Sequence, residues 1–253
     1  MIRKTLLSTL IVGTALVLSQ CNKDDSSENT TTADVTFNVV MTDGENQVYD
    51  GETVSLQNGY DLKISLFRMF LSGIEIKNSA GNWVMLKDVV IVDPGSTQIT
   101  DRQFTANVNV GNYTALRYGL GLDATMNNSD PSTFNQNHPL STYQAMYWTM
   151  LKYRFAKFEG LANVTGQLGS SSDILVAFHP GTDDLYRTDE VLINNNVQAG
   201  QSNTISLELD LNALFAGTNA FDFSTESSTH SMPSDIALAA KFMDKLKVSL
   251  SVE

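Results

Sequence analysis

The feature that most constrains the fold of this chain is an alternation of apolar and polar residues that recurs in many short runs. A period of two residues is typical of strands with one buried and one solvent-facing side. Turn-forming pairs such as Asn58-Gly59 and Pro94-Gly95 separate the runs. The alternating apolar positions are Val35, Phe37, Val39 and Met41; Leu62, Ile64 and Leu66; Phe70, Ile74 and Ile76; Phe104, Ala106, Val108 and Val110; Leu116, Tyr118, Leu120 and Leu122; Ile174, Val176 and Phe178; Ile205, Leu207, Leu209 and Leu211; and Val248, Leu250 and Val252. Many short strands at this spacing predict an all-β fold, either an antiparallel β-sandwich or an open barrel.

Two segments interrupt the alternation. Residues 123–150 begin with a polar stretch too long for an ordinary turn, which predicts a long loop insertion of the kind that often carries function. Residues 233–246 place apolar side chains with helical spacing, and Pro233 suits a first turn, so we expect a short C-terminal helix. We find no internal repeat and no linker, which predicts one domain over residues 35–253.

The N-terminus is typical of a bacterial lipoprotein signal. Arg3 and Lys4 precede a short apolar run, and Cys21, the single cysteine of the chain, follows it. The run is too short to favour a membrane-spanning helix, which needs roughly 20 apolar residues. We therefore predict a lipoprotein signal peptide at residues 1–20, a lipid anchor on Cys21 and a flexible acidic and polar tether at residues 21–34.

The predicted lipid anchor and the charge of the mature chain indicate where the protein resides and which class of partner it does not bind. The acyl chains on Cys21 would hold the protein on a membrane, and the acidic residues that follow resemble an export tag to the outer face of the cell, so we expect an outer membrane lipoprotein. Exposure at the cell surface and attachment to the inner leaflet are both open on the sequence. Without Arg3 and Lys4, the mature chain has 14 basic and 28 acidic side chains, a net charge of −14. Nucleic acid is excluded as a partner, because phosphate binding needs clustered Lys and Arg.

The residues that could carry chemistry are few. The chain has three histidines, namely His138 at the end of the insertion, His179 at the end of a strand and His230 before the C-terminal helix. Imidazole nitrogen is a good ligand for copper and zinc, although a lone histidine is more often a polar surface residue. The sequence has no conventional metal-ligand spacing, no G-x-S-x-G and no phosphate-binding loop, so we do not expect an enzyme.

Several segments together resemble the copper-binding MbnP-like family, over about Val35 to Val252. The most specific are R-Y-G-L-G-L-D, within residues 111–123, and M-Y-W, at residues 146–148. The others are residues 62–77, Pro139-Leu140, residues 153–160, Phe178-His179-Pro180-Gly181, and Thr229-His230-Ser231-Met232 followed by residues 236–246. Met150, Lys152 and Pro180 depart from the pattern of the family, since a tryptophan, a glycine and an uninterrupted H-x-G segment are expected there.

This resemblance implies an extracytoplasmic β-sandwich protein that binds copper, for uptake, storage or delivery. Some members of the family bind the metal through histidine and an oxidised tryptophan, kynurenine, made by a di-haem partner enzyme. By resemblance, His138, His179 and His230 are the candidate copper ligands and Trp148 is the candidate oxidised residue. A di-haem peroxidase-like enzyme is then the expected maturation partner, and Glu159 or Asp123 could orient a histidine.

Two other hypotheses stay open on the sequence alone. A non-metal, adhesive sandwich that binds a glycan or a protein would have dispersed histidines and an aromatic patch made from residues such as Trp83, Tyr143 or Tyr186. A hydrolase on the same scaffold would need a carboxylate pair or a Ser-His pair, for which the sequence shows no spacing. The copper hypothesis predicts instead that the histidines converge.

Overall fold

The computed structural model describes residues 31–164 and 168–252, which form a domain of two principal β-sheets. The predicted signal peptide, Cys21 and most of the predicted tether lie outside the described residues. The all-β sandwich fold, with a long loop insertion and a short C-terminal helix, is confirmed. Among the described residues, no helix is long and apolar enough to cross a membrane.

The smaller sheet has four strands in the order β14-β12-β1-β5. The strands are β1 (Thr32–Thr42), β5 (Gln103–Asn109), β12 (Asn203–Asp210) and β14 (Leu250–Val252). β1 pairs antiparallel with β5 but parallel with β12, so this sheet is not purely antiparallel. β1 includes Thr32, Ala33 and Asp34, which the sequence placed at the end of the tether, because these residues pair with the end of β5.

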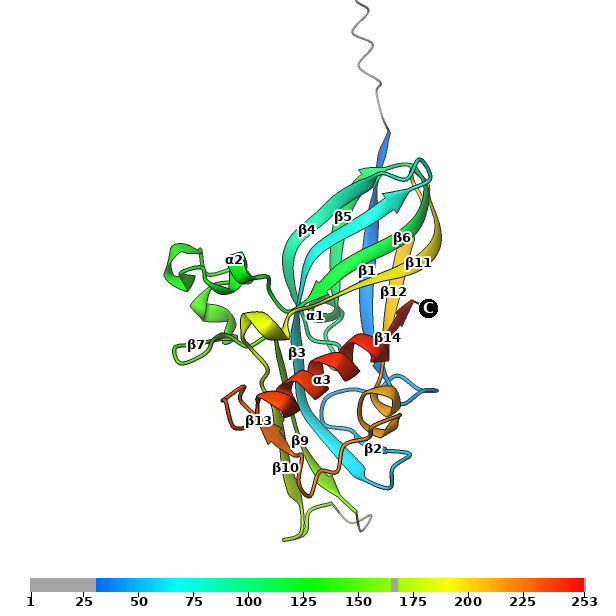
Figure 1. Cartoon of the computed structure of the whole chain (residues 1–253). Coiled ribbons are helices and arrows are strands. Elements are labelled where there is room, and N and C mark those ends of the chain that lie inside the picture. The colour runs from blue at the N-terminus through cyan, green and yellow to red at the C-terminus, as the bar shows by residue number, and fades with distance from the viewer. Residues whose placement is uncertain (1–30, 165–167, 253) are drawn as a thin grey trace, which may run out of the picture. The chain divides into compact units, whose positions relative to one another are not determined.

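The larger sheet is organised around one long strand, β3 (Asp61–Asn78). The first half of β3 pairs with β2 and β9, and its second half pairs with β4 and β6, so β3 runs through the length of the domain (Figure 1). The order is β11-β6-β3-β9-β10-β13, with β2 and β4 also on β3. The bounds are β2 (Thr53–Ser55), β4 (Trp83–Val92), β6 (Gly111–Leu120), β9 (Ala156–Asn163), β10 (Ile174–Phe178), β11 (Arg187–Val197) and β13 (Ser228–Thr229).

Irregular pairing in β3 explains why its sequence looked like two strands. The register between β3 and β9 shifts between Ile64 and Leu66, which reverses the side of the sheet that alternate residues face. Phe67 and Met69 are therefore fully buried, whereas Leu66, expected to face inward, is only half-buried. A bulge inserts one residue and flips every later side chain, so a single strand can carry two phases of alternation.

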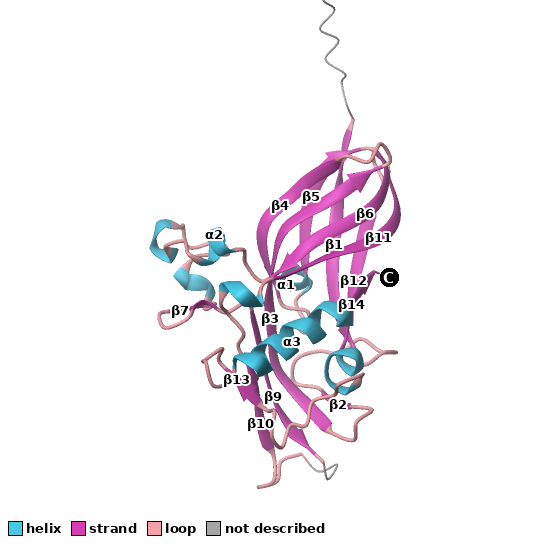
Figure 2. Ribbon diagram, in the orientation of Figure 1, coloured by secondary structure: helices cyan, strands magenta, loops and turns pink. Residues whose placement is uncertain are grey.

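Helical segments lie in the insertion and at the C-terminus (Figure 2). The insertion contains α2 (Ala124–Asn127), η1 (Pro131–Thr133), η2 (Thr142–Gln144) and a small hairpin of β7 (Tyr147–Trp148) and β8 (Lys152–Tyr153). The remaining short elements are α1 (Ile99–Arg102), η3 (Asp183–Leu185) and η4 (Asn212–Ala216). α3 (Ile236–Ser249) is the predicted helix, and it extends past Leu246, so Val248 is helical and exposed rather than part of a strand.

A cluster of aromatic rings backs the end of the domain where β9, β10 and α3 meet. Phe178 of β10 stacks on Phe242 of α3, with ring centroids 4.9 Å apart, and packs edge-on against Phe221 at 5.1 Å. Phe158 of β9 packs against Phe215 at 4.8 Å. These side chains are at most 1% exposed, and rings of this size dominate the energetics of a core. The cluster therefore fixes the position of the residue that follows Phe178, which is His179.

Candidate functional site

The end of β10 and the end of β13 bring His179 and His230 together. The two strands are parallel, and Phe178 is the register partner of Thr229, so the next residue of each chain is a histidine at the same level. The imidazole centroids lie 4.9 Å apart, with the rings perpendicular. The backbone N–H of His179 donates to the carbonyl of Thr229 at 2.9 Å, which continues the strand pairing up to the histidines.

A carboxylate from the start of α3 holds the backbone around His230. Asp235 accepts from the Thr229 hydroxyl at 3.0 Å and from the His230 backbone N–H at 3.2 Å. Ser231, at a positive φ of 59°, accepts from the Gly181 backbone N–H at 2.9 Å. These bonds fix the backbone at His230, whose ring nitrogens have no hydrogen-bond partner among the described residues.

His179 is buried, and its imidazole is oriented by Glu159. The side chain is 10% exposed, and Nε2 lies 2.9 Å from Glu159 Oε1. Since a carboxylate accepts, Nε2 carries the proton and donates, which leaves the lone pair of Nδ1 available. Burial lowers the pKa of His179 to about 4, against the opposing effect of Glu159, and the nearby His230 and Arg154 lower it further. The imidazole is therefore neutral at pH 7, the form that binds metals.

Trp148 completes the cluster from the insertion. The indole lies against His230, with ring centroids 5.8 Å apart. Trp148 is held by the β7–β8 hairpin, where it is the register partner of Lys152. Two backbone bonds secure the hairpin, from Arg154 N–H to Met146 O at 2.8 Å and from Phe155 N–H to Pro180 O at 2.6 Å. The second of these bonds ties the hairpin directly to the turn after His179.

His138 lies in another environment. Its ring stacks on Phe134 with centroids 4.3 Å apart, and its Nδ1 accepts from the Leu140 backbone N–H at 3.1 Å. In the part of the chain that the structure describes, it makes no ring contact or hydrogen bond with His179, His230 or Trp148. The structure therefore brings together three of the four residues predicted to form the metal site, and it does not bring His138 to them.

The donors that converge here suit a soft, low-coordinate ion. Over residues 31–164 and 168–252, no three His, Cys, Asp or Glu side chains meet in a way that could hold a metal ion. Two imidazoles are nevertheless enough for a two-coordinate Cu(I) ion, and imidazole is a ligand for both oxidation states of copper. Glu159 occupies one nitrogen of His179, so its role is to orient that ligand.

Sequence reasoning anticipated part of this arrangement. Of the two candidate orienting carboxylates, Glu159 contacts a histidine, whereas Asp123 caps α2 by accepting from the Met126 backbone N–H at 2.8 Å. The roles of Asp235 and Arg154 were missed. Asp235 looked like a residue that favours the start of a helix, and nothing in the sequence indicated that its side chain bonds backwards to residues 229 and 230.

Comparisons with known proteins agree with this geometry at the level of the fold. The model of the MbnP family matches residues 30–232 of the chain. Among solved structures, MbnP from Methylosinus trichosporium is similar with a TM-score of 0.56 and 17% sequence identity, over 88% of this chain and 99% of that one. No curated protein matches the sequence.

Proposed function

The chain belongs to the MbnP family, and on this premise we propose that it is an extracytoplasmic lipoprotein that binds copper through His179 and His230. Copper is here the cargo of the protein, for uptake, storage or delivery, and the protein is not itself an enzyme. The observation that supports the proposal most directly is the pair of imidazoles 4.9 Å apart, one of them buried and neutral. A buried neutral imidazole with a free lone pair has no protein partner to lose when it binds a metal.

His179 would form one half of the copper site in an orientation that is fixed before the metal binds. Glu159 fixes the ring from one side, and the aromatic core behind Phe178 prevents the strand from shifting. His230 supplies the other half, because Asp235 holds its backbone while its ring nitrogens have no hydrogen-bond partner among residues 31–164 and 168–252.

Trp148 enters the proposal as the residue that a di-haem peroxidase-like partner would oxidise to kynurenine. The indole lies next to His230 and is half-buried, so it is close to the imidazole pair and still reachable. With two equivalents of hydrogen peroxide as the oxidant, the C2–C3 bond of the indole would break, two oxygen atoms would be added and the peroxide would be reduced to water. Hydrolysis of the resulting N-formyl group would release formate and leave an aryl amine, a nitrogen donor, on the same side chain. This donor would join the two imidazoles, which alone give a low coordination number.

We propose that a lipid anchor on Cys21, the acylated first residue of the mature protein, holds this site outside the cytoplasm, at the outer membrane. The net charge of −14 calculated for the mature chain, without Arg3 and Lys4, favours the approach of metal cations.

Copper titration of the mature lipoprotein, purified in detergent from its native host, tests the histidine pair. We expect one copper ion per chain, measured by competition with a Cu(I) chelator and by metal analysis. His179→Ala and His230→Ala should each abolish stoichiometric binding, whereas the matched variant His138→Ala should retain it. Binding that survives in both of the first two variants, or no binding by the wild type, would contradict the proposal.

The same preparation tests the accessory residues. Glu159→Gln removes the carboxylate that orients His179, and a change of this kind weakens metal affinity by about 10–100-fold. Intact-mass analysis should find the kynurenine form at Trp148 when the partner enzyme is present and tryptophan when it is deleted. Full copper binding by protein with an unmodified Trp148 would still support binding by the histidine pair, but it would show that Trp148 is not a copper ligand.

A further inference from the structure

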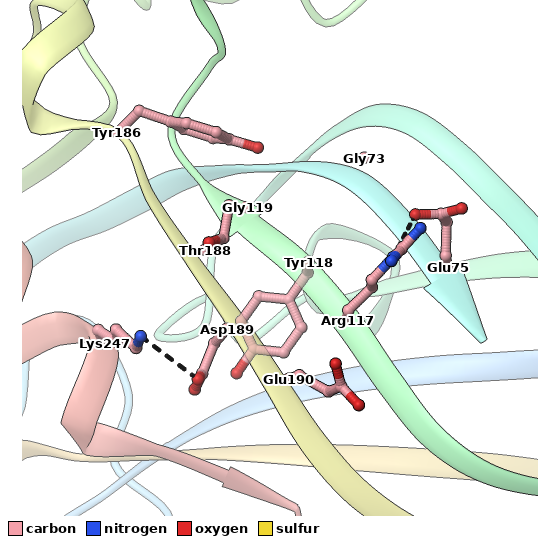
Figure 3. Close-up of a pocket in the computed structure, with 10 residues that line it drawn as sticks. All are labelled: Gly73, Glu75, Arg117, Tyr118, Gly119, Tyr186, Thr188, Asp189, Glu190 and Lys247. Carbon is pink, nitrogen blue, oxygen red and sulfur yellow. Dashed lines mark hydrogen bonds and ion pairs between the residues drawn. The ribbon is translucent and has the colours of Figure 1, made fainter. Parts of the chain in front are cut away.

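A hollow on the larger sheet, lined by residues that do not belong to the histidine cluster, has the features of a second binding site. It has a volume of about 660 Å³, within the range of small-molecule sites. It is lined by residues from three neighbouring strands, β3, β6 and β11, together with Tyr186 and Lys247 (Figure 3). It shares no lining residue with Trp148, Glu159, His179 and His230.

Two glycines open this hollow. Ser72 is the register partner of Gly119 and Glu75 of Arg117, so β3 carries one more residue than β6 at this point and bulges at Gly73, which has a positive φ of 53°. Gly119 lies beneath the ring of Tyr186, because a Cβ at Gly119 would be 2.0 Å from the Tyr186 hydroxyl oxygen. The close approach leaves the tyrosine lying across the sheet rather than standing away from it (Figure 3).

Trp83 does not line the hollow, but it holds one of the residues that do. The guanidinium of Arg117 lies 4.3 Å from the ring centroid of Trp83 and pairs with Glu75 at 2.5 Å. Stacking on one face and pairing along the edge hold the guanidinium in place while leaving its side chain 42% exposed. The hollow therefore combines the ring of Tyr186 with an Arg117–Glu75 pair that is held in a fixed position.

Each cation of the hollow is paired with a carboxylate. Arg117 pairs with Glu75, and Lys247 is 3.7 Å from Asp189. Glu190 is the register partner of Arg117 on β11 and adds a third carboxylate. An anionic ligand would have to break one of these pairs and would meet a lining with more carboxylates than cations. A neutral ligand rich in hydroxyl groups can instead donate to the carboxylates and accept from the cations while both pairs persist.

We propose that this hollow binds a neutral oligosaccharide, with a sugar ring packed on Tyr186 and hydroxyl groups bonded to the Arg117–Glu75 pair, which Trp83 holds in place. The flat, partly exposed face of Tyr186 suits the C–H face of a sugar, which is apolar, while its hydroxyl group can stay in water. The fixed ion pairs provide both donors and acceptors at short range. The site is separate from copper binding and would let a lipoprotein on the outer membrane hold an extracellular glycan.

The test uses the mature lipoprotein in detergent and a panel of neutral hexasaccharides of glucose, mannose, xylose and galactose, with α and β linkages. We expect at least one of them to bind, by calorimetry, with an affinity that does not change between dilute buffer and high salt, because the ligand carries no charge. Tyr186→Ala and Trp83→Ala should each weaken binding at least about tenfold. Tyr143→Ala, an exposed tyrosine outside the hollow, is the matched control and should bind as the wild type does.

A milder variant separates loss of the site from loss of the fold. Gly119→Ala adds one methyl group that must displace Tyr186, so it should weaken the saccharide while thermal unfolding stays close to that of the wild type. Copper binding should be unchanged in all of these variants, which distinguishes failure of this site from failure of the metal site. No binding by any member of the panel, or binding that is insensitive to Tyr186→Ala and Trp83→Ala, would overturn the proposal.

Discussion

The histidine cluster and the hollow on β3, β6 and β11 use opposite strategies to present polar groups. The cluster is backed by a buried aromatic core, and burial keeps His179 neutral with a lone pair free. The hollow lies where the sheet is open to solvent, and each of its two cations has a carboxylate partner. Burial thus keeps the imidazole of His179 in the neutral form that binds metals, whereas the ion pairs of the hollow form a surface that suits a neutral ligand.

The largest expected effect comes from a variant that removes part of the aromatic core behind the histidine cluster. Phe178→Ala deletes a ring that is fully buried against Phe242 and Phe221, and truncations of this kind cost about 3–5 kcal/mol of unfolding free energy. Denaturant unfolding measures it. Leu175→Ala on the same strand is the control, because Leu175 is 68% exposed and its truncation should change stability by no more than about 0.5 kcal/mol. Equal effects of the two variants would show that the cluster is not backed by a tight core.

The next effect is a pH dependence of stability that belongs to the cluster. The folded pKa of His179, about 4, is below its ordinary value of 6.5, so the unfolded chain binds the proton more tightly. The stabilisation from neutral His179 is present above pH 6.5 and is lost as the pH falls towards 4, by about 3 kcal/mol. His179→Gln should remove this loss, as measured by urea unfolding at several pH values.

The contribution of Asp50 must be separated from this measurement, because it changes the free energy of unfolding with pH in the opposite direction. Burial, helped by the nearby Asp93, raises the pKa of Asp50 to about 6. Its contribution to stability is therefore present below pH 3.8 and is lost as the pH rises through 6. The difference between the wild type and His179→Gln cancels this effect, since both contain Asp50. A difference that does not vary between pH 6.5 and 4 would contradict the assignment of His179 as a buried neutral group.

The smallest effect is expected at the hollow. Arg117→Ala removes an ion pair with Glu75 in which the arginine side chain is 42% exposed, and solvent-exposed pairs contribute at most about 1 kcal/mol. The change in melting temperature should be small, and smaller again in high salt. A loss as large as that of Phe178→Ala would mean that the Arg117–Glu75–Trp83 group holds the sheet together, and the contrast between the two regions would fail.

Several strands escaped sequence prediction for a physical reason. β11 alternates half-buried with exposed residues along most of its length, so neither of its faces shows a clear apolar period. β4 is half-buried at most positions, and its apolar residues form two runs, residues 83–86 and 89–92, rather than an alternation. Hydrophobic periodicity indicates a strand only where one face is buried and the other is not. These two strands border β3 and β6 in the open part of the sheet, where that condition is not met.

The sequence by itself determined the sandwich fold, the C-terminal helix and membership of the MbnP family, because these follow from local alternation, helical spacing and the R-Y-G-L-G-L-D and M-Y-W segments. It also provided the histidines and Trp148 as candidates. Only the tertiary structure decided which of them meet. His179 and His230 lie 51 residues apart in the chain and become neighbours through the parallel register of β10 and β13, whereas His138 packs on Phe134. Strand register depends on the packing of the whole sheet, so no local pattern can reveal it.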